Sequence, residues 1–274
     1  MAGRAHRKTA IDQDRLPSLR QTDLTTFRQP VAVGDSWVTG GAHRDKRATI
    51  STNRTMPAKP TIIFDIETGP LPLSELNIPP FNAADVKLGN IKNPDLIAEK
   101  LQKAEETHTA DYIRNAALDA LSGQILCIGY RFEHQHLGVL KNDGNEAAML
   151  REWWTMLNYY ERQPKLIGFN IKAFDLPFLI KRSWKHRIAP PYWLRQGRYW
   201  NDLVVDLREV WQLGDNRAHG SLGSICRHLG LGDKTGTGAE FSLLWNTNRQ
   251  AALDYCLRDV QLTQQVADIL IPAY

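Results

Sequence analysis

The sequence predicts an α/β domain with a mixed central sheet whose faces are covered by helices. Two observations support this fold class. Buried-strand patterns come first and recur between helical patterns, and the last third of the chain is helical. This order of elements is typical of a sheet flanked by helices. The length of 274 residues and the apolar content of 42% suit one large domain or two small ones.

The first 58 residues differ in composition from the rest of the chain. They are rich in Arg, Thr, Ser, Gly and Asp and lack apolar periodicity, which predicts a disordered basic extension before a folded domain over 59–274. Residues 1–59 carry 11 basic and 5 acidic residues, so the net positive charge of the chain comes from this part. We interpret the extension as a solvated tail, with weak, salt-sensitive nucleic-acid binding as the alternative. Met56 is either the domain boundary or the true start of the protein.

The first half of the domain alternates strand and helix patterns. Thr61–Phe64 is an apolar run typical of a buried strand, and it ends at Asp65. An extended loop follows, marked by Pro70, Pro72, Pro79 and Pro80. The next predicted elements are a helix from Asn93 to about Glu106, a helix over 109–121, and strands over 124–130 and 137–140.

The second half of the domain begins with an amphipathic helix over 145–162. Four of its apolar residues recur at the i, i+3, i+4 and i+7 spacing of one helix face, namely Leu150, Trp153, Trp154 and Leu157. We therefore expect the tryptophan pair to face the core rather than to form a base-stacking platform. The remaining elements are predicted as strands over 165–169 and 203–206, and helices over 174–186, 221–229, 239–245 and 249–270.

Three acidic segments carry the strongest functional signal. Asp65 and Glu67 are two residues apart at the end of a strand, so their side chains point to the same side. Tyr255 and Asp259 are four apart on a helix and share one face. Asp175 falls in the first turn of another helix, where an acid also has an ordinary role in complementing the helix dipole. If the four carboxylates converge, they repel one another unless cations lie among them, which indicates a divalent-metal site.

Other motifs favour structural roles. The segment 192–200 interleaves aromatic and basic residues as single-strand binders do, but we favour a loop pinned by buried aromatic residues. The segment 230–238 contains Lys234 without the spacing of a nucleotide-binding P-loop. The cysteines form no Cys-x-x-Cys pair and are predicted to be buried thiols in a reducing compartment; they are Cys127, Cys226 and Cys256.

The acidic segments also resemble the motifs of a known family. In order they read Phe64-Asp65-Ile66-Glu67-Thr68, Asn170-Ile171-Lys172-Ala173-Phe174-Asp175 and Tyr255-Cys256-Leu257-Arg258-Asp259. This set is similar to that of the DEDD superfamily of 3′–5′ exonucleases, in the subclass with tyrosine in the third motif. More narrowly, the chain resembles the stand-alone exonucleases related to the proofreading domain of family B DNA polymerases. The resemblance covers about residues 60–270 and implies a ribonuclease-H-like fold with a helical insertion after the first strand.

The resemblance implies a role for each matching residue. It implies two divalent cations, Mg²⁺ or Mn²⁺, with Asp65 as a ligand of both. Glu67 and Asp259 would complete the site of the metal that activates water, and Asp175 would support the second metal. Tyr255 would orient the attacking water, because a phenol at neutral pH is better suited to donating a hydrogen bond than to removing a proton. Substrate binding is implied for Thr68, Asn170 and Phe174, of which Asn170 is equally a turn residue and Phe174 equally a core residue.

The implied activity is hydrolysis of phosphodiester bonds at the 3′ ends of single-stranded DNA, with release of nucleoside 5′-monophosphates. A ribonuclease with the same site is the alternative, since recognition of a 2′-OH depends on a few contacts. A catalytically inactive nucleic-acid-binding module is a third interpretation, but such a module would be expected to lose acids, and all four are present. No apolar run approaches the roughly 20 residues of a membrane helix. We expect a cytoplasmic or nucleoid-associated protein without a membrane partner.

Overall fold

The computed structural model describes residues 59–133, 136–159, 163–215, 217–218, 220–232, 236 and 238–273. All of them belong to the unit Thr55–Tyr274. The predicted N-terminal extension and the boundary predicted at Met56 lie outside the described residues. In the described ranges, no helix combines the length and the apolar character that crossing a membrane requires.

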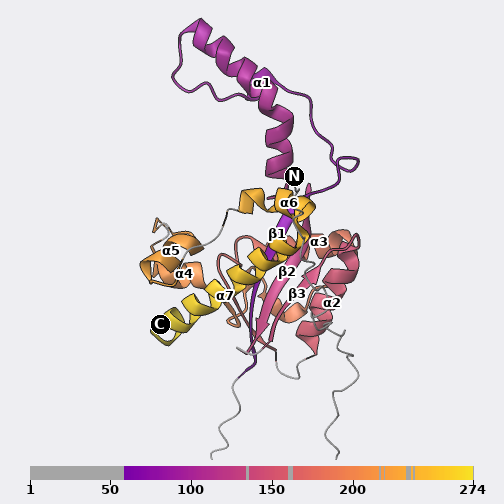
Figure 1. Ribbon diagram of the computed structural model, residues 1–274, viewed down its shortest axis with the longest axis vertical. Helices are drawn as coiled ribbons and strands as arrows, with labels where there is room; N and C mark the ends of the chain where they lie inside the picture. The colour runs from indigo at the N-terminus through magenta and orange to yellow at the C-terminus, as the bar shows by residue number, and fades with distance from the viewer. Residues whose placement is uncertain are drawn as a thin grey trace, which may run out of the picture. The chain divides into compact units, whose positions relative to one another are not determined.

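A five-stranded mixed sheet with the strand order β3-β2-β1-β4-β7 lies at the centre of the domain (Figure 1). The central strand β1 (Thr61–Pro70) pairs antiparallel with β2 (Gly123–Phe132) and parallel with β4 (Lys165–Gly168). β3 (His136–Lys141) and β7 (Val204–Asp206) form the two edges. This arrangement confirms the predicted mixed central sheet.

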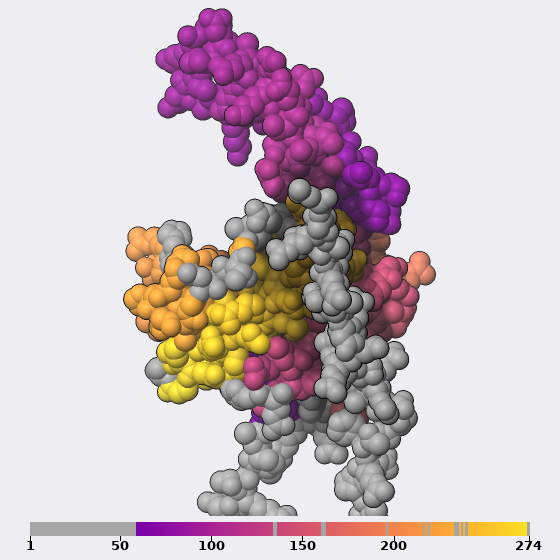
Figure 2. Space-filling model, in the orientation of Figure 1, coloured from indigo at the N-terminus to yellow at the C-terminus, as the bar shows by residue number. Residues whose placement is uncertain are grey.

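Helices cover both faces of the sheet. In chain order, the α-helices of the described residues are α1 (Pro94–Ala116), α2 (Glu146–Asn158), α3 (Asp175–Lys185), α4 (Leu207–Gln212), α5 (Leu222–His228), α6 (Gly238–Thr247) and α7 (Arg249–Ala273). On one face, α2 and α3 share a core cluster with β1 and β2. In that cluster Trp153 and Trp154 are buried, which confirms that the tryptophan pair faces the core. On the other face, α7 contacts β1, β2 and β3, and its outer side forms part of the surface in Figure 2.

The alternation of side chains along β1 decides which residues meet α7. Ile66 packs in the cluster shared with α2 and α3. Ile63 points the other way and packs with Val260 of α7. Since side chains alternate along a strand, Asp65 and Glu67 point to the same side as Ile63. The two acids of β1 therefore lie on the face of the sheet that α7 covers.

One continuous helix, α1, replaces the two helices predicted over 93–121. Asn93 caps it as predicted, with Oδ1 accepting a hydrogen bond from the Asp95 N–H at 2.9 Å. The expected break does not occur because the sequence there contains neither Gly nor Pro. Instead, the hydroxyl of Thr107 donates to Asp111 Oδ2 one turn later, at 2.9 Å. Most other predicted helices and strands are present, with ends that differ by a few residues.

The aromatic and basic segment 192–200 forms a short turn and a small hairpin, with strands β5 (Arg195–Gln196) and β6 (Tyr199–Trp200). Trp193 and Leu194 are 6% and 1% exposed and belong to the core cluster beneath α2 and α3. The burial of Trp193 agrees with the predicted loop pinned by buried aromatic residues, but Tyr192 and Tyr199 are exposed, so the prediction is confirmed only in part.

A buried ion pair fixes the ends of α2 and α3 to the sheet. The Glu146 carboxylate accepts hydrogen bonds from the Ile125 N–H at 2.8 Å and from Nη2 of Arg182 at 2.6 Å, and His186 Nε2 lies 2.8 Å away. Arg182 Nη1 also donates to the Ala120 carbonyl at 3.1 Å. Burial acts to raise the pKa of Glu146, but the hydrogen bonds from Arg182, Ile125 and His186 outweigh it, and the pKa lies below its ordinary value. The carboxylate therefore stays charged and links the start of β2 to both helices.

Candidate active site

The sequence predicted Asp65 and Glu67 at the end of a strand. They lie instead within β1, because the strand continues to Pro70. Their position still resembles a strand end on one side, since β4 pairs with β1 only over residues 61–63. On the other side, β2 carries an extra residue opposite the step from Glu67 to Thr68. Such an irregularity bends the strand and changes the direction of nearby side chains. The two acids therefore lie where β1 is no longer paired with β4 and where its pairing with β2 becomes irregular.

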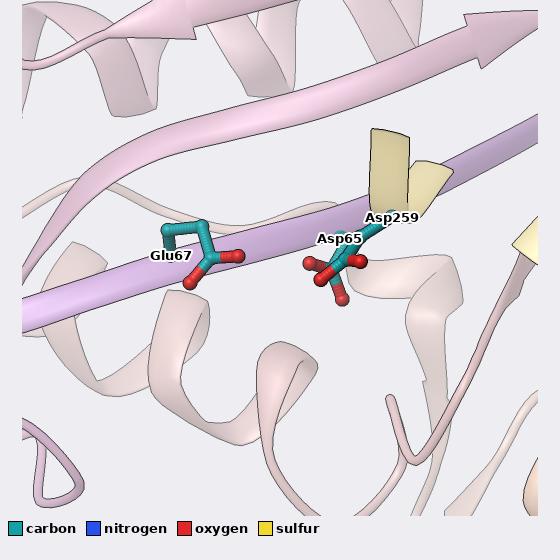
Figure 3. A group of neighbouring side chains, drawn as sticks. All are labelled: Asp65, Glu67 and Asp259. Atoms are coloured by element: carbon teal, nitrogen blue, oxygen red, sulfur yellow. The ribbon is translucent and has the colours of Figure 1, made fainter. Parts of the chain in front are cut away.

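Asp259 of α7 joins these two acids (Figure 3). One carboxylate oxygen from each of Asp65, Glu67 and Asp259 lies within 4.8 Å of the others. Glu67 and Asp259 are 7% and 1% exposed, and Asp65 is half-buried. Charges this close and partly withdrawn from water repel strongly unless a cation shares them. A donor set of carboxylate oxygens alone is the kind that Mg²⁺ and Mn²⁺ prefer.

Gly129 of β2 allows α7 to approach the sheet beside these acids. It lies directly opposite Asp65 in the register of β1 and β2. A Cβ atom at this position would meet two side chains of α7, Cys256 Sγ at 2.7 Å and Val260 Cγ2 at 2.9 Å. The absent side chain therefore provides the space for the turn of α7 that carries Asp259.

Cys256 lies next to the acids without adding charge to them. The three cysteines are buried free thiols, as predicted. A hydrogen bond with Cys127, burial, and the negative charges of Asp65 and Asp259 raise the pKa of the Cys256 thiol well above its ordinary value. The thiol therefore remains neutral between β2 and α7.

Asp175 reaches the same place from the first residue of α3. Its Oδ1 accepts a hydrogen bond at 3.0 Å from the N–H of Ile66, the residue between Asp65 and Glu67. Ile66 lies beyond the last residue of β1 that pairs with β4, so its backbone can bond to a side chain. The Asp175 carboxylate is 3% exposed. The fourth predicted acid is thus fixed to the backbone between Asp65 and Glu67, although it is not part of the group of carboxylate oxygens that lie within 4.8 Å of one another.

Asp206 organises the loop between β4 and α3. Its carboxylate accepts hydrogen bonds from the N–H groups of Asn170 at 2.8 Å and Lys172 at 2.9 Å. It also caps α4, a helix absent from the prediction, by accepting from the Arg208 N–H at 3.0 Å. Asn170 has a φ of 63°, which is consistent with the turn role considered for it. Its Oδ1 accepts a hydrogen bond from Arg208 Nη1 at 3.0 Å.

Three of the acids, Asp65, Glu67 and Asp175, line a cleft of about 500 Å³. Phe174 lines this cleft and also packs against Phe178, with ring centroids 5.6 Å apart. Its two interpretations, core residue and substrate contact, are therefore compatible. The described residues that line the cleft are Asp65, Ile66, Glu67, Phe169, Asn170, Phe174, Asp175, Arg208, Gly220, Ser221 and Leu222.

Three predicted site residues, Asp259, Tyr255 and Thr68, are absent from the described lining of the cleft. Tyr255 lies one turn before Asp259, is 7% exposed, and packs its ring on Phe241 with centroids 5.7 Å apart. The Thr68 hydroxyl donates to the Ala117 carbonyl at 2.6 Å, which ties β1 to the end of α1. The roles implied for Tyr255 and Thr68 stay predictions.

The sequence reasoning missed Arg208. Among the described residues that line the cleft, Arg208 is the only basic one. A single arginine on a six-residue helix has neither a periodic pattern nor a motif spacing to mark it. The capping role of Asp206 could have been found, since aspartate is a preferred residue immediately before a helix.

Comparison with known families places much of this chain in one of them. The family is described as a predicted 3′–5′ exonuclease related to the exonuclease domain of PolB, and its model matches residues 110–266, more than half of the chain. The matched range contains Asp175, Tyr255 and Asp259, while Asp65 and Glu67 precede it. A search of curated proteins gives no match.

A solved structure supports the fold. The family B DNA polymerase from the hyperthermophilic archaeon Pyrobaculum calidifontis is similar to this chain, with a TM-score of 0.53 and 16% sequence identity. The match covers 79% of this chain and 25% of the polymerase, so the chain spans about a quarter of that protein. At this identity the likeness concerns the fold alone. The family match shows that this chain belongs to the predicted 3′–5′ exonucleases related to the exonuclease domain of PolB.

Proposed function

We propose that this protein is a metal-dependent exonuclease that removes nucleotides from the 3′ ends of single-stranded DNA and releases nucleoside 5′-monophosphates. The observation that carries this proposal is the convergence of Asp65, Glu67 and Asp259 within 4.8 Å beside a cleft. Asp175 adds a fourth carboxylate through its bond to the backbone between the first two. Family membership supports the direction of cleavage.

The donor set fits two divalent cations, Mg²⁺ or Mn²⁺. It offers carboxylate oxygens only, and four negative charges balance the four positive charges of two such ions. Asp65, Glu67 and Asp259 would hold one cation, and Asp65 with Asp175 would hold the second. When bound, two cations activate a water molecule and stabilise the leaving oxygen of an in-line displacement.

Other residues of the chain would position the strand and the water. Tyr255 shares a helix face with Asp259, and we propose that its phenol orients the attacking water by a hydrogen bond. Phe174 presents its ring to the cleft and would stack on the terminal base. Asn170 would hold the sugar of the terminal nucleotide. Thr68 would contribute to substrate binding indirectly, because its hydrogen bond to Ala117 holds β1 in position.

Release of mononucleotides tests the proposal. Single-stranded DNA and matched RNA, each labelled at the 3′ end, would be incubated with Mg²⁺, with Mn²⁺ or with EDTA, and the products identified by mass. We expect nucleoside 5′-monophosphates from DNA with either metal and no release in EDTA. Internal fragments, or release from the 5′ end first, would contradict the proposal. Faster release from RNA would assign the site to a ribonuclease instead.

A pair of variants on one helix provides a matched control. Asp254 lies on α7 like Asp259 but is exposed, and its Oδ1 accepts a hydrogen bond from Gln250 at 2.8 Å. Asp259→Ala should abolish release, whereas Asp254→Ala should leave it unchanged. Equal effects of the two substitutions would show that general disturbance of α7, rather than loss of a ligand, explains the result.

A further inference from the structure

Arg208 is a cation in a cleft whose other charged lining residues are acids. Among the described lining residues, three are acidic, namely Asp65, Glu67 and Asp175, and Arg208 is the only basic one. Its side chain is half-buried. A half-buried guanidinium at a cleft wall is poorly placed to act as a solvated surface charge.

Arg208 is held in place at both its backbone and its side chain. Its N–H donates to the buried Asp206 carboxylate at 3.0 Å, and its Nη1 donates to Asn170 Oδ1 at 3.0 Å. Asp206 also accepts from the Asn170 N–H at 2.8 Å, so one buried carboxylate fixes both members of the pair. A guanidinium has five N–H donors, and the bond to Asn170 uses one of them. Donors therefore remain for a ligand in the cleft.

The charge of the site also fits an anionic ligand at Arg208. The proposed cations neutralise the four carboxylates, which leaves the charge of Arg208 in excess. A guanidinium in a partly dehydrated cleft forms strong, charge-assisted hydrogen bonds to phosphate oxygens, often two in parallel. One further phosphodiester group would balance this charge.

We propose that Arg208 binds an inner phosphate of the substrate strand, on the 5′ side of the phosphate that is cleaved. This inference rests on the proposed exonuclease function. A strand that ends in a 3′-OH has no phosphate on the 3′ side of its terminal linkage. A second phosphate in the cleft therefore belongs to a linkage on the 5′ side of the scissile bond, and Arg208 sets the register of the strand by holding it.

A purely structural role for Arg208 is the alternative. If the guanidinium only holds the Asn170 amide, its loss should affect all substrates alike. A methylphosphonate linkage separates the two cases, because it removes the charge of one chosen phosphate and leaves the scissile bond intact. If Arg208 contacts that phosphate, the effects on KM of substituting Arg208 and of modifying the linkage are not additive.

A scan of linkages tests the proposal. Single-stranded DNA with one methylphosphonate at the second, third or fourth linkage from the 3′ end would be compared with unmodified DNA. The enzymes would be wild type, Arg208→Met, Arg208→Lys and Arg217→Met. Arg217 is 95% exposed and absent from the described lining of the cleft, so Arg217→Met controls for the loss of one positive charge. KM and kcat for release of the first nucleotide would be measured.

For the wild type we expect one inner linkage at which methylphosphonate raises KM roughly 10- to 100-fold. Arg208→Met should raise KM by a similar factor on unmodified DNA and should no longer respond to that modification. Arg208→Lys should lie between the two, and Arg217→Met should behave as wild type. In EDTA, Arg208→Met should also lower the slope of log Kd for single-stranded DNA against log salt by roughly 0.7, as measured by fluorescence anisotropy.

Equal penalties of the modified linkage in wild type and Arg208→Met would overturn the proposal. A wild type that responds to none of the three inner modifications would also overturn it, and that result does not depend on a variant that folds. A wild type that releases no nucleotide from unmodified DNA would instead overturn the proposed function. The two failures are therefore distinguishable.

Discussion

At the scale of single residues, the acids of the cleft oppose the stability of the fold that holds them. Asp65, Glu67 and Asp259 place carboxylate oxygens within 4.8 Å of one another. Their repulsion is partly shielded from water, so it acts against folding when no cation is bound. Removing one of these charges should therefore cost activity rather than stability.

Asp65→Ala should lower mononucleotide release by at least about 100-fold, because it removes the carboxylate proposed to touch both cations. In metal-free buffer its Tm should be unchanged or higher by about 2–4 °C, because one repulsive charge is lost. Thermal unfolding in EDTA and with Mn²⁺ measures both points, since Mn²⁺ should raise the Tm of the wild type but not of the variant. Full activity of this variant with Mg²⁺ would contradict the metal assignment.

Tyr255→Phe should lower kcat by roughly 10- to 100-fold and leave the Mn²⁺-dependent rise in Tm unchanged. The phenylalanine ring preserves the packing on Phe241 and removes only the hydroxyl that we assign to the water. Steady-state kinetics and thermal unfolding with and without Mn²⁺ check the two parts. If the rise in Tm disappears, Tyr255 contributes to metal binding and its proposed role is wrong.

At the scale of elements, the close approach of α7 to β2 brings Asp259 to the acids of β1. This approach depends on Gly129, because a Cβ atom there would meet Cys256 Sγ at 2.7 Å. Apolar packing and a hydrogen bond between Cys256 and Cys127 also hold the helix to the strand. A small change at Gly129 should therefore act on catalysis through α7.

Gly129→Ala should destabilise the fold by about 1–3 kcal/mol, because the added methyl group forces α7 outward. Activity should fall further than the loss of folded protein explains. The double variant Gly129→Ala, Cys256→Ala removes the nearest atom and should recover part of both losses, which denaturant unfolding and nucleotide release would measure. Strictly additive effects of the two substitutions would show that Cys256 is not the group displaced.

The ion pair of Glu146 and Arg182 acts at the same scale by holding α2 and α3 to the start of β2. Glu146→Gln should destabilise the fold by about 3–5 kcal/mol at pH 7, because it leaves the Arg182 charge buried without its partner. The pKa of Glu146 is lowered in the folded state, so its contribution is present above the ordinary glutamate pKa and is lost as the pH falls through the lower folded value.

Denaturant unfolding at pH 7, 4 and 3 measures this dependence. The difference between wild type and Glu146→Gln should shrink as the pH falls. Glu75→Gln is a matched control, because Glu75 pairs with Lys185 at 3.9 Å on the surface, with both side chains about half exposed. Its substitution should cost less than about 1 kcal/mol. If the difference in free energy of unfolding between wild type and Glu146→Gln stays constant over this pH range, Glu146 is not charged in the folded state as assigned.

At the scale of the whole molecule, the sequence predicted what depends on local spacing. The period of two placed Asp65 and Glu67 on one side of a strand, and the period of 3.6 placed Tyr255 and Asp259 on one helix face. The apolar stripe of α2 predicted its buried tryptophan pair. These features require only a few neighbouring residues to be recognised.

The features that could not be predicted depend on contacts between distant parts of the chain. The bond from Arg208 to Asn170 joins the helix α4 to a loop 38 residues earlier in the chain, and no local pattern marks Arg208. The strand β1 extends past its acids because β2 pairs with it as far as Pro70. Similarly, the role of Gly129 depends on the close approach of α7, which lies far away in the sequence.

The distribution of the acids along the chain has a consequence for the cell during translation. Asp65 is synthesised early, whereas Asp259 lies on the last helix, α7. At ribosomal rates of about 5–20 residues per second, the nascent chain carries the first acids for roughly 10–40 seconds before the last one exists. Until α7 has emerged and docked, the carboxylate cluster is incomplete. If Asp259 holds a cation as we propose, a growing chain in which α7 has not yet docked should be unable to hydrolyse the nucleic acids around it.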